Sequence, residues 1–503
     1  MDRKYSLFEV CRSFHGCYDP AADRFSSVVM LINGDWINAD ESGFEVINPA
    51  DGTILEQVPD GGRAAAQEAI AAATEAFKTW SKTTPYERSD ILRKAHDLML
   101  ERKQDLARTM TLEQGKPLRA ALNEVQYGAD FLSWFAEEAK RIYGETIPSS
   151  RADQRFIVSY QPVGVVAAVT PWNYPVSMIT RKVGPALAAG CTVVLKPAEA
   201  TPLCAIKVFE CLIDAGLPPG VINLVTALDP APIGDEFVSN PSVRKLTFTG
   251  STAVGKMLAG QAAANMKRVS CELGGHAPFL VFEDADAVHA AKGAQMVKFL
   301  NTGQACISPN RMLVQKNLVP QFIEIMVDRV KKLKAGSGLE EGVAIGPLVN
   351  ESAIEKVDKQ VKDAVERGAT LHCGGHRLTD SGLDAGFFYA PTVLSGVTED
   401  MLIYREETFG PVAAIIEFED EARALEMAND TDYGLAAYIY TRDIGRAFRV
   451  FEGLNFGIIG INDINPTSAA APFGGMKDSG LGREGSREGI MEYLETKLGG
   501  IAI

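Results

Sequence analysis

The chain of 503 residues has few of the features that mark membrane, secreted or nucleic-acid-binding proteins. No apolar run approaches the roughly 18 residues of a membrane-spanning helix, and the N-terminus lacks the ordered parts of a signal peptide. The eight cysteines form no CxxC pair, which favours thiols in a reducing compartment over a disulfide framework. The 50 basic residues are outnumbered by 65 acidic ones, giving a net charge of −15, and no basic run with interleaved aromatics suggests nucleic acid. We therefore predict a cytoplasmic protein that binds small molecules.

Two common site motifs are also missing. His372, Cys373 and His376 lie close together, but no second ligand cluster follows nearby, so we predict no metal site. The usual GxGxxG motif is replaced by a Gly-Ser turn, Gly250 and Ser251, between an expected strand and an expected helix. Such a turn alone is more often a helix cap. Its position in an α/β chain favours a pyrophosphate site, because free N–H groups and a positive helix end would face the ligand.

The hydrophobic pattern predicts two α/β lobes. At this length, 46% hydrophobic residues suffice for more than one core. Short apolar runs alternate with helical stretches, which is typical of parallel sheets built from βαβ units. The expected strands are 163–169, 192–196, 221–225 and 244–248 in the first lobe, and 279–282, 311–315 and 412–418 in the second. A capping box at 84–87 predicts a helix start, and 319–333 has an amphipathic pattern. Residues 1–29 carry no pattern and are interpreted as an N-terminal extension.

Three residues could together oxidise an aldehyde through a thioester. Cys306 supplies a soft nucleophile, Glu272 a carboxylate base, and Asn173 a neutral amide donor for an oxyanion. A preorganised site would lower the thiol pKa from about 8.5. A lone cysteine is more often a small buried hydrophobe, and this is our interpretation of Cys191, Cys204, Cys211, Cys271 and Cys373.

Lys196 and Glu199 follow the expected strand 192–196, where ligands of open α/β sheets bind. Here we expect the ribose of a dinucleotide. A carboxylate accepts hydrogen bonds from ribose hydroxyls but repels a 2′-phosphate, so NAD is favoured over NADP. The alternative is a surface loop with an ordinary Lys/Glu pair.

The chain resembles the aldehyde dehydrogenase superfamily over about residues 30 to 500. The resemblance rests on seven segments in the family's order: 170–175 (TPWNYP), 196–199 (KPAE), 248–255 (FTGSTAVG), 272–275 (ELGG), 303–306 (GQAC), 406–412 (EETFGPV) and 472–477 (PFGGMK). It implies two α/β lobes with a Rossmann-like NAD-binding domain at 30–142 and 163–274 and a catalytic domain at 275–475. It also implies oligomerisation segments at 143–162 and 476–503, with a hairpin and a strand near 492–498 that build a homodimer or homotetramer.

The resemblance also implies individual roles. Cys306 would be the nucleophile, Glu272 the base that activates the hydrolytic water, and Asn173 the partner of the Cys306 N–H in binding the oxyanion. Lys182 and Glu484 would relay the proton from Glu272. The implied cofactor contacts are Trp172, Lys196, Glu199, Gly250, Ser251, Glu407 and Phe409.

Residues 177–191 are similar to those of succinate semialdehyde dehydrogenases, which implies a substrate that carries a carboxylate. That carboxylate would be bound by Arg181 and Ser468, with Phe473 beside it. Leu300 occupies the place where a second arginine is expected. Losing one charge-assisted donor reduces affinity by about 1.5–3 kcal/mol, so a longer, neutral or aromatic aldehyde is the alternative substrate. Lys298 lies two residues away and points elsewhere on a helix.

Other departures and competing functions remain. Ser308 stands where some relatives carry a second cysteine, so their disulfide switch is absent, and His276 is interpreted as a structural side chain. Transfer of the acyl group to coenzyme A is disfavoured because Glu272 provides a hydrolytic base. A catalytically silent structural relative would lack Cys306 or Glu272. A cysteine hydrolase needs a histidine partner that none of the six histidines obviously supplies.

Overall fold

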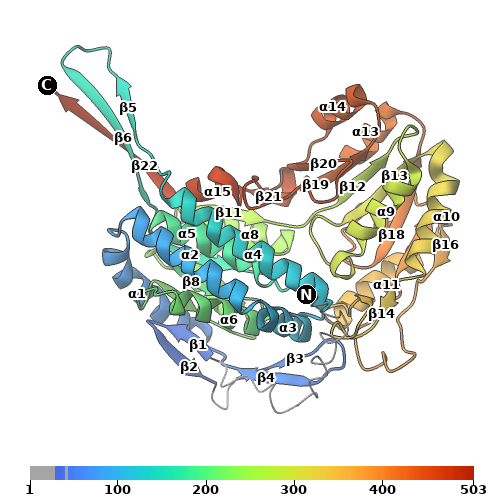
Figure 1. The fold of residues 1–503 in the computed structure, drawn as a ribbon, viewed down its shortest axis with the longest axis horizontal. Helices are drawn as coiled ribbons and strands as arrows, with labels where there is room; N and C mark the ends of the chain where they lie inside the picture. Colours follow the sequence, from blue (N-terminus) through green and yellow to red (C-terminus); the bar gives the residue numbers. More distant parts are fainter. Residues whose placement is uncertain (1–28, 40–42) are drawn as a thin grey trace, which may run out of the picture.

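The computed structural model describes residues 29–39 and 43–503, which form two large sheets with helical layers and a projecting arm (Figure 1). The predicted N-terminal extension lies outside the described residues except for Val29. The first sheet has the order β2-β1-β9-β8-β7-β10-β11-β21, and the second has the order β16-β17-β18-β13-β12-β19-β20. The predicted arrangement of two α/β lobes is confirmed.

The first sheet has a parallel centre between antiparallel edges. Its parallel strands are β7 (Val165–Val169), β8 (Thr192–Lys196), β9 (Ile222–Leu224), β10 (Val243–Thr249) and β11 (Arg268–Glu272). Its antiparallel strands are β1 (Val29–Ile32), β2 (Asp35–Asn38) and β21 (Gly480–Leu481). Strands β7, β8 and β9 are buried along almost their whole length because helices cover both faces.

One face of this sheet packs on α2 (Pro85–Glu101), α3 (Lys103–Gln114), α4 (Leu118–Ala139), α5 (Ser177–Ala189) and α6 (Pro202–Asp214). The other face packs on α1 (Gly62–Trp80), α7 (Ala231–Ser239) and α8 (Thr252–Ala263). The predicted capping box of α2 is present, since Thr84 Oγ1 accepts from the Glu87 N–H at 3.2 Å and Glu87 Oε2 accepts from the Thr84 N–H at 2.7 Å.

The order in which successive strands are added to this sheet reverses between the neighbouring strands β7 and β10. From β7 the chain continues outward through β8 and β9, and then returns to add β10 and β11 on the other side. In open α/β sheets, ligands bind beyond the carboxyl ends of the strands at such a switch point. The predicted cofactor segments after β7, β8 and β10 therefore meet at one edge of the sheet.

The second sheet is built from β12 (Ala277–Val281), β13 (Pro309–Gln315), β16 (Thr370–Cys373), β17 (Thr392–Ser395), β18 (Val412–Phe418), β19 (Ala436–Tyr440) and β20 (Ile458–Ile461). Its helices are α9 (Ala287–Lys298), α10 (Val319–Val330), α11 (Glu351–Glu366), α12 (Leu402–Arg405), α13 (Glu421–Asn429) and α14 (Ile444–Gly453). Small pairs are formed by β3 (Phe44–Ile47) with β4 (Ile54–Val58), and by β14 (Lys334–Ala335) with β15 (Val343–Ile345).

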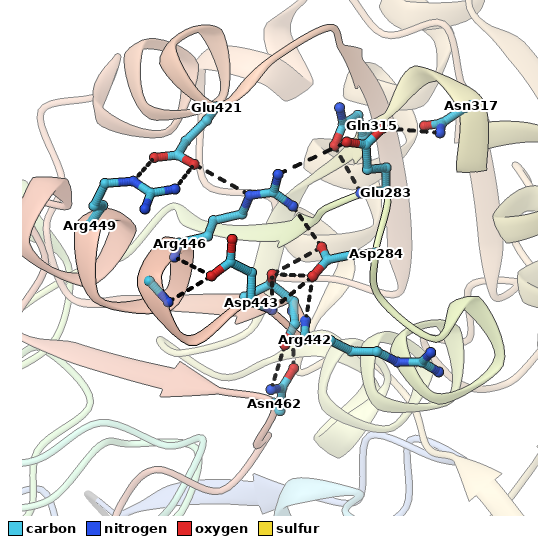
Figure 2. A network of polar contacts seen from close by, with 12 residues as sticks. Glu283, Asp284, Gln315, Asn317, Glu421, Arg442, Asp443, Arg446, Arg449 and Asn462 are labelled. Carbon is cyan, nitrogen blue, oxygen red and sulfur yellow. Dashed lines mark hydrogen bonds and ion pairs between the residues drawn. The ribbon is translucent and has the colours of Figure 1, made fainter.

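A charged network attaches α13 and α14 to the end of β12 (Figure 2). Arg446 Nη1 donates to Asp284 Oδ1 at 2.7 Å, and its Nε reaches Glu421 Oε2 at 3.3 Å. Arg449 adds a second donor to Glu421 at 2.8 Å. Asp443 caps the start of α14. The outer helices of the second lobe are thereby fixed to the sheet by side chains remote from the predicted site residues.

A three-stranded arm of β5 (Glu145–Pro148), β6 (Gln154–Pro162) and β22 (Leu494–Ala502) extends from the body and carries the C-terminus (Figure 1). The predicted segment 476–503 is only partly in this arm. Gly480 and Leu481 pair with β11, and α15 (Ser486–Met491) packs against α4 and α5, where its buried Ile490 joins the first lobe's core. The strand expected at 492–498 is longer and begins at Leu494.

Within residues 29–39 and 43–503, no helix is both long and apolar enough to cross a bilayer. The same part of the chain contains no group of three or more His, Cys, Asp or Glu side chains arranged to hold a metal ion.

Candidate active site

The loop that carries Cys306 is held in an unusual backbone conformation. Asn301, Thr302 and Gly303 all have left-handed φ angles of 50°, 59° and 78°. Such angles are unfavourable for non-glycine residues, so the surroundings must hold them. Thr302 Oγ1 accepts from the Gly346 N–H at 3.0 Å, and a Cβ on Gly303 would lie 2.1 Å from the Gly410 carbonyl oxygen. The turn fixes the position of the following residues, including Cys306.

Cys306 opens onto a cavity of about 1100 Å³ between the two lobes. Arg181, Leu300 and Phe473 line the same cavity, as three of the four predicted substrate contacts. Its other walls are largely apolar and include Leu118, Leu122, Tyr127, Tyr174, Met178, Met296, Phe299, Ile307, Leu333 and Val343. Arg181 is only 2% exposed, which excludes a role as a charge on the helix surface.

The expectation of a lowered thiol pKa is not met. Burial raises the pKa of Cys306 to about 12, and the carboxylates of Glu407 and Glu272 add to this effect while Arg181 opposes it. Desolvation disfavours the thiolate more than the single cation favours it. The thiol must therefore lose its proton to a nearby acceptor as it reacts.

Asn173 lies directly beside the cysteine loop. Its Nδ2 donates to the backbone carbonyl of Gln304 at 3.1 Å, two residues before Cys306. Asn173 itself does not line the cavity, although the next residue, Tyr174, does. The amide has two N–H donors, so one remains for a second acceptor.

Glu272 is buried at the end of β11, and its Oε2 has no hydrogen-bond partner. Glu272 itself does not line the cavity, whereas Phe473 does. A Cβ atom added to Gly474, the residue after Phe473, would lie 2.8 Å from Glu272 Oε1, so the carboxyl lies behind this part of the wall. Burial raises the pKa of Glu272 well above its usual value, and the nearby Glu484 carboxylate raises it further. A buried carboxyl with a raised pKa is suited to accept a proton near neutral pH.

Lys182, Arg181 and Glu484 form a buried charged cluster next to Glu272. Lys182 Nζ donates to Glu484 Oε1 at 2.6 Å, and Arg181 Nε lies 2.9 Å from Glu484 Oε2. Burial alone would raise the pKa of Glu484, but the two cations outweigh it and lower that pKa. The pKa of Glu484 is thus lowered while that of Glu272 is raised, so Glu272 is the more readily protonated of the two carboxyls.

Arg181 lines the cavity and also carries a buried donor without a partner. Its guanidinium carbon lies 3.7 Å from the centre of the Phe473 ring. Its Nη2 is buried without a hydrogen-bond partner. An unpaired buried donor destabilises a protein by about 1–3 kcal/mol, so Nη2 could bind an acceptor that comes within hydrogen-bond distance.

Ser468 is not placed as predicted. It is exposed and does not line the cavity, because the loop before Pro472 turns so that Thr467 forms the wall instead. Leu300 does line the cavity, so an apolar side chain stands where the second arginine was expected. Arg119, at the start of α4, is a further cation on the wall and makes no hydrogen bond or ion pair with any described residue.

The predicted cofactor residues gather at the switch point of the first sheet. Lys196 is buried at the end of β8 and pairs with the half-exposed Glu199 at 3.0 Å. Gly250 and Ser251 lead from β10 into α8, and the Ser251 side chain makes no capping hydrogen bond, so the first N–H groups of α8 are left for another acceptor. Thr249 Oγ1 is also buried without a partner. These groups fit a dinucleotide with a pyrophosphate over α8.

A second group of predicted cofactor residues lies at the boundary of the lobes. Glu407 Oε1 accepts from the Gly275 N–H at 2.8 Å, and burial raises the pKa of this carboxyl. Phe409 has a left-handed φ of 54° and packs edge-on against Trp172, with 5.6 Å between ring centroids. The strained backbone of Phe409 thus holds its ring beside the segment after β7.

His276, next in sequence to Gly275, is fully buried. Its Nε2 lies 2.7 Å from the Tyr404 carbonyl oxygen, and burial lowers its pKa well below the usual value. The neutral ring attaches the segment after Glu272 to α12, as expected for a structural side chain.

Sequence reasoning missed a group of residues that hold Asn173 in place. Lys116 and Asn301 both donate to the Asn173 carbonyl oxygen, at 2.9 and 3.0 Å. Glu124 forms a buried ion pair with Lys116. No motif marks these residues, because the fold brings them to Asn173 from positions far apart in the sequence.

The sequence model of the aldehyde dehydrogenase family matches residues 36–498. The chain belongs to the aldehyde dehydrogenase family. This membership confirms the resemblance drawn from the seven segments, and it makes the chain an aldehyde-oxidising enzyme of a family that uses NAD or NADP.

Known relatives of this enzyme act on semialdehydes according to their names. Succinate-semialdehyde dehydrogenase [NADP(+)] GabD of Escherichia coli (strain K12) is 52% identical over 93% of this chain and 96% of that protein. A glutarate-semialdehyde dehydrogenase of Pseudomonas aeruginosa is 50% identical over 93% of this chain and 97% of that protein. The crystal structure of succinate-semialdehyde dehydrogenase from Burkholderia pseudomallei superposes with a TM-score of 0.93 at 48% identity, covering 96% of this chain and 99% of that chain. The predicted fold is thereby confirmed.

Proposed function

We propose that this enzyme oxidises a semialdehyde, an aldehyde with a carboxylate at its far end, to the dicarboxylic acid, with water as the acyl acceptor. The observation that carries the proposal is that Cys306 and Arg181 line one cavity, and that Arg181 Nη2 has no hydrogen-bond partner. A substrate carboxylate would supply the acceptor that Arg181 lacks while its aldehyde group reaches the thiol. The names of the succinate and glutarate relatives support this substrate class.

Cys306 would act as the nucleophile. Its thiol, with a pKa raised by burial, gives its proton to water or to the deprotonated Glu272 carboxylate as the sulfur adds to the aldehyde carbon, and the aldehyde oxygen becomes an anion. The free N–H of Asn173 and the backbone N–H of Cys306 would donate to that oxygen. Each such donor typically contributes about 10²- to 10³-fold to turnover.

Glu272 would act as the base in hydrolysis of the thioester. In its deprotonated form it takes a proton from the attacking water, and its raised pKa makes it a better acceptor than an ordinary glutamate. Lys182 and Glu484 lie directly beyond it as a connected ion pair. We assign to them the onward transfer of the proton.

The cofactor would lie across the switch point. Lys196 and Glu199 would hold a ribose, Gly250 and Ser251 the pyrophosphate, and Glu407, Phe409 and Trp172 would hold the nicotinamide end. When bound, the nicotinamide supplies the hydride acceptor. The edge-on pair of Trp172 and Phe409 and the Gly275–Glu407 hydrogen bond would set the distance between that ring and Cys306.

Within the family's choice of NAD or NADP, we propose NAD as the preferred cofactor. The Glu199 carboxylate would repel a 2′-phosphate at the ribose position. GabD of Escherichia coli carries NADP(+) in its name, so the preference needs a direct test. The ratio of kcat/KM for NAD+ to that for NADP+ should favour NAD+ in wild type and fall roughly tenfold in Glu199→Gln, which removes about 1.4 kcal/mol of repulsion. An unchanged ratio would assign the choice to other residues.

Leu300 supports a second substrate class, neutral or aromatic aldehydes. Its apolar side chain forms part of the cavity wall where a cation was expected. The cavity is also far larger than a four-carbon semialdehyde. Arg119, which pairs with no other described residue, lines the cavity and could bind the carboxylate of a longer semialdehyde, although Glu340 and Glu341 also line it. Chain length and charge therefore have to be varied separately.

An aldehyde panel tests the substrate class. Semialdehydes of increasing length are compared with neutral aldehydes of matched length in wild type and Arg181→Gln. Because Arg181 also contacts Glu484, all rates can fall, and the ratio of charged to neutral substrates is the decisive value. A carboxylate anchor predicts that this ratio drops roughly 10- to 100-fold in the variant. An equal loss for both substrate types would contradict the anchor and favour neutral aldehydes.

We further propose that the arm of β5, β6 and β22 joins subunits into a homodimer or homotetramer, since it projects from the body with largely exposed strands (Figure 1). The division into cofactor and catalytic domains at about residue 274 is part of the same proposal, supported by the change of sheet between β11 and β12. The cytoplasmic location stays a prediction.

A further inference from the structure

A fully buried ion pair lies beneath the segment that carries Asn173. Lys116 follows α3, Glu124 lies in α4, and both side chains are 1% exposed. Burial lowers the pKa of Lys116, because the charge is removed from water. Replacing a buried ion pair with apolar residues is often neutral or stabilising. Fold stability is therefore a poor explanation for this pair.

Apart from the ion pair with Glu124, the side chain of Lys116 contacts the segment after β7. Its Nζ donates to the Asn173 carbonyl oxygen at 2.9 Å and lies 3.8 Å from the centre of the Tyr174 ring. The same carbonyl oxygen accepts from Asn301 Nδ2 at 3.0 Å. Asn301 is part of the left-handed turn before Cys306. One peptide group is thus held both by the buried cation and by the nucleophile loop.

Glu124 holds the other end of the same segment. Its Oε1 accepts from the N–H groups of Val176 and Ser177, at 3.0 and 3.2 Å, at the start of α5. A carboxylate at a helix start satisfies N–H groups that have no partner within the helix. α5 carries Arg181 and Lys182. The pair therefore spans residues 173–177 and fixes the start of the helix that carries the charged cluster.

We infer that Lys116 and Glu124 are positioning residues for the oxyanion donor Asn173. The inference rests on the proposed function, because it assigns the pair an effect on the reaction. The pair holds the Asn173 backbone so that one side-chain N–H bonds the Gln304 carbonyl and the other stays directed to the oxyanion. Neither residue needs to touch the reacting atoms, and their effect on turnover passes through Asn173.

A double-mutant cycle on the full-length enzyme tests this route. Rates of aldehyde oxidation are measured at saturating cofactor for wild type, Lys116→Met, Asn173→Ala and the double variant. We expect kcat/KM to fall roughly 10- to 100-fold in Lys116→Met, and to change less than about threefold when the same substitution is made in Asn173→Ala. The same fold-loss in both backgrounds would overturn the inference.

A second variant separates positioning from stability. Lys116→Met combined with Glu124→Gln removes both charges but keeps an oxygen for the Val176 and Ser177 N–H groups. The midpoint of thermal unfolding should return close to that of wild type, while kcat/KM stays at least about tenfold low. Recovery of kcat/KM together with the midpoint would show a structural role only and overturn the inference.

Glu113→Gln provides the matched control. Glu113 is also a buried carboxyl that accepts two N–H groups at a helix start, from Leu203 and Cys204 at α6, but it lies away from the cavity. Its substitution should produce similar fold-losses in the wild-type and Asn173→Ala backgrounds. Failure of the proposed function has a different signature, since wild type would then form no NADH or NADPH from any aldehyde.

Discussion

The carbonyl oxygen of Cys306 lies against Gly275, where a methyl group would come within 2.3 Å of that oxygen. Gly275 follows β11, a strand of the first sheet, whereas Cys306 precedes β13, a strand of the second sheet. Their contact links the segment of the predicted base to the loop of the predicted nucleophile. It requires a residue without a side chain.

Gly275→Ala should displace the cysteine loop and lower kcat/KM for aldehyde oxidation roughly 100-fold, since a shift of about 1 Å in a reacting group has an effect of that size. The measurement is steady-state turnover together with thermal unfolding. Gly260→Ala in α8, where an added Cβ meets no atom within 4 Å, is the control and should keep wild-type turnover. Wild-type turnover in Gly275→Ala would show that the contact does not control the nucleophile.

Turnover should rise with pH through an ionisation above the usual glutamate value. Glu272 accepts a proton only in its deprotonated form, and burial together with Glu484 raises its pKa. Where hydrolysis limits the rate, kcat therefore increases as pH rises through the raised pKa of Glu272. The check is a kcat profile from about pH 5 to about pH 9 in wild type and Glu272→Gln. Persistence of the same rising limb in Glu272→Gln would assign it to another group.

Leu300→Arg should restore the missing cation of the substrate site. We expect kcat/KM for succinate semialdehyde to increase roughly 10- to 100-fold relative to a neutral aldehyde of matched length. Leu300→Met keeps an apolar side chain and is the control. If charged and neutral substrates respond equally to Leu300→Arg, the residue does not select for the carboxylate.

The main features of the fold were predictable because its central strands are continuous apolar runs. The boundaries expected for β8 and β18 coincide with the observed ones, since both strands are buried along almost their whole length and end at clear turns. The C-terminal segment was harder to predict. Gly480 and Leu481 are too short to show a strand pattern, and only tertiary pairing with β11 defines them.

The site was predictable where a residue acts through its own chemistry. Cys306, Arg181 and Phe473 were expected at the site and line one cavity, whereas Ser468 was replaced on the wall by Thr467. The raised thiol pKa and the left-handed turn at Asn301 depend on burial and on distant neighbours, which local sequence does not record. The pair of Lys116 and Glu124 could not be predicted from the sequence for the same reason.

The central claim is that Cys306 forms an acyl intermediate that Glu272 later helps to release. Rapid mixing of Glu272→Gln with cofactor and aldehyde should give a burst of about one reduced cofactor per active site, followed by little turnover, and mass spectrometry should find the acyl group on the peptide that contains Cys306. Cys306→Ala should give neither burst nor adduct. Steady turnover at the wild-type rate in Glu272→Gln, or an acyl group on a different residue, would contradict the claim.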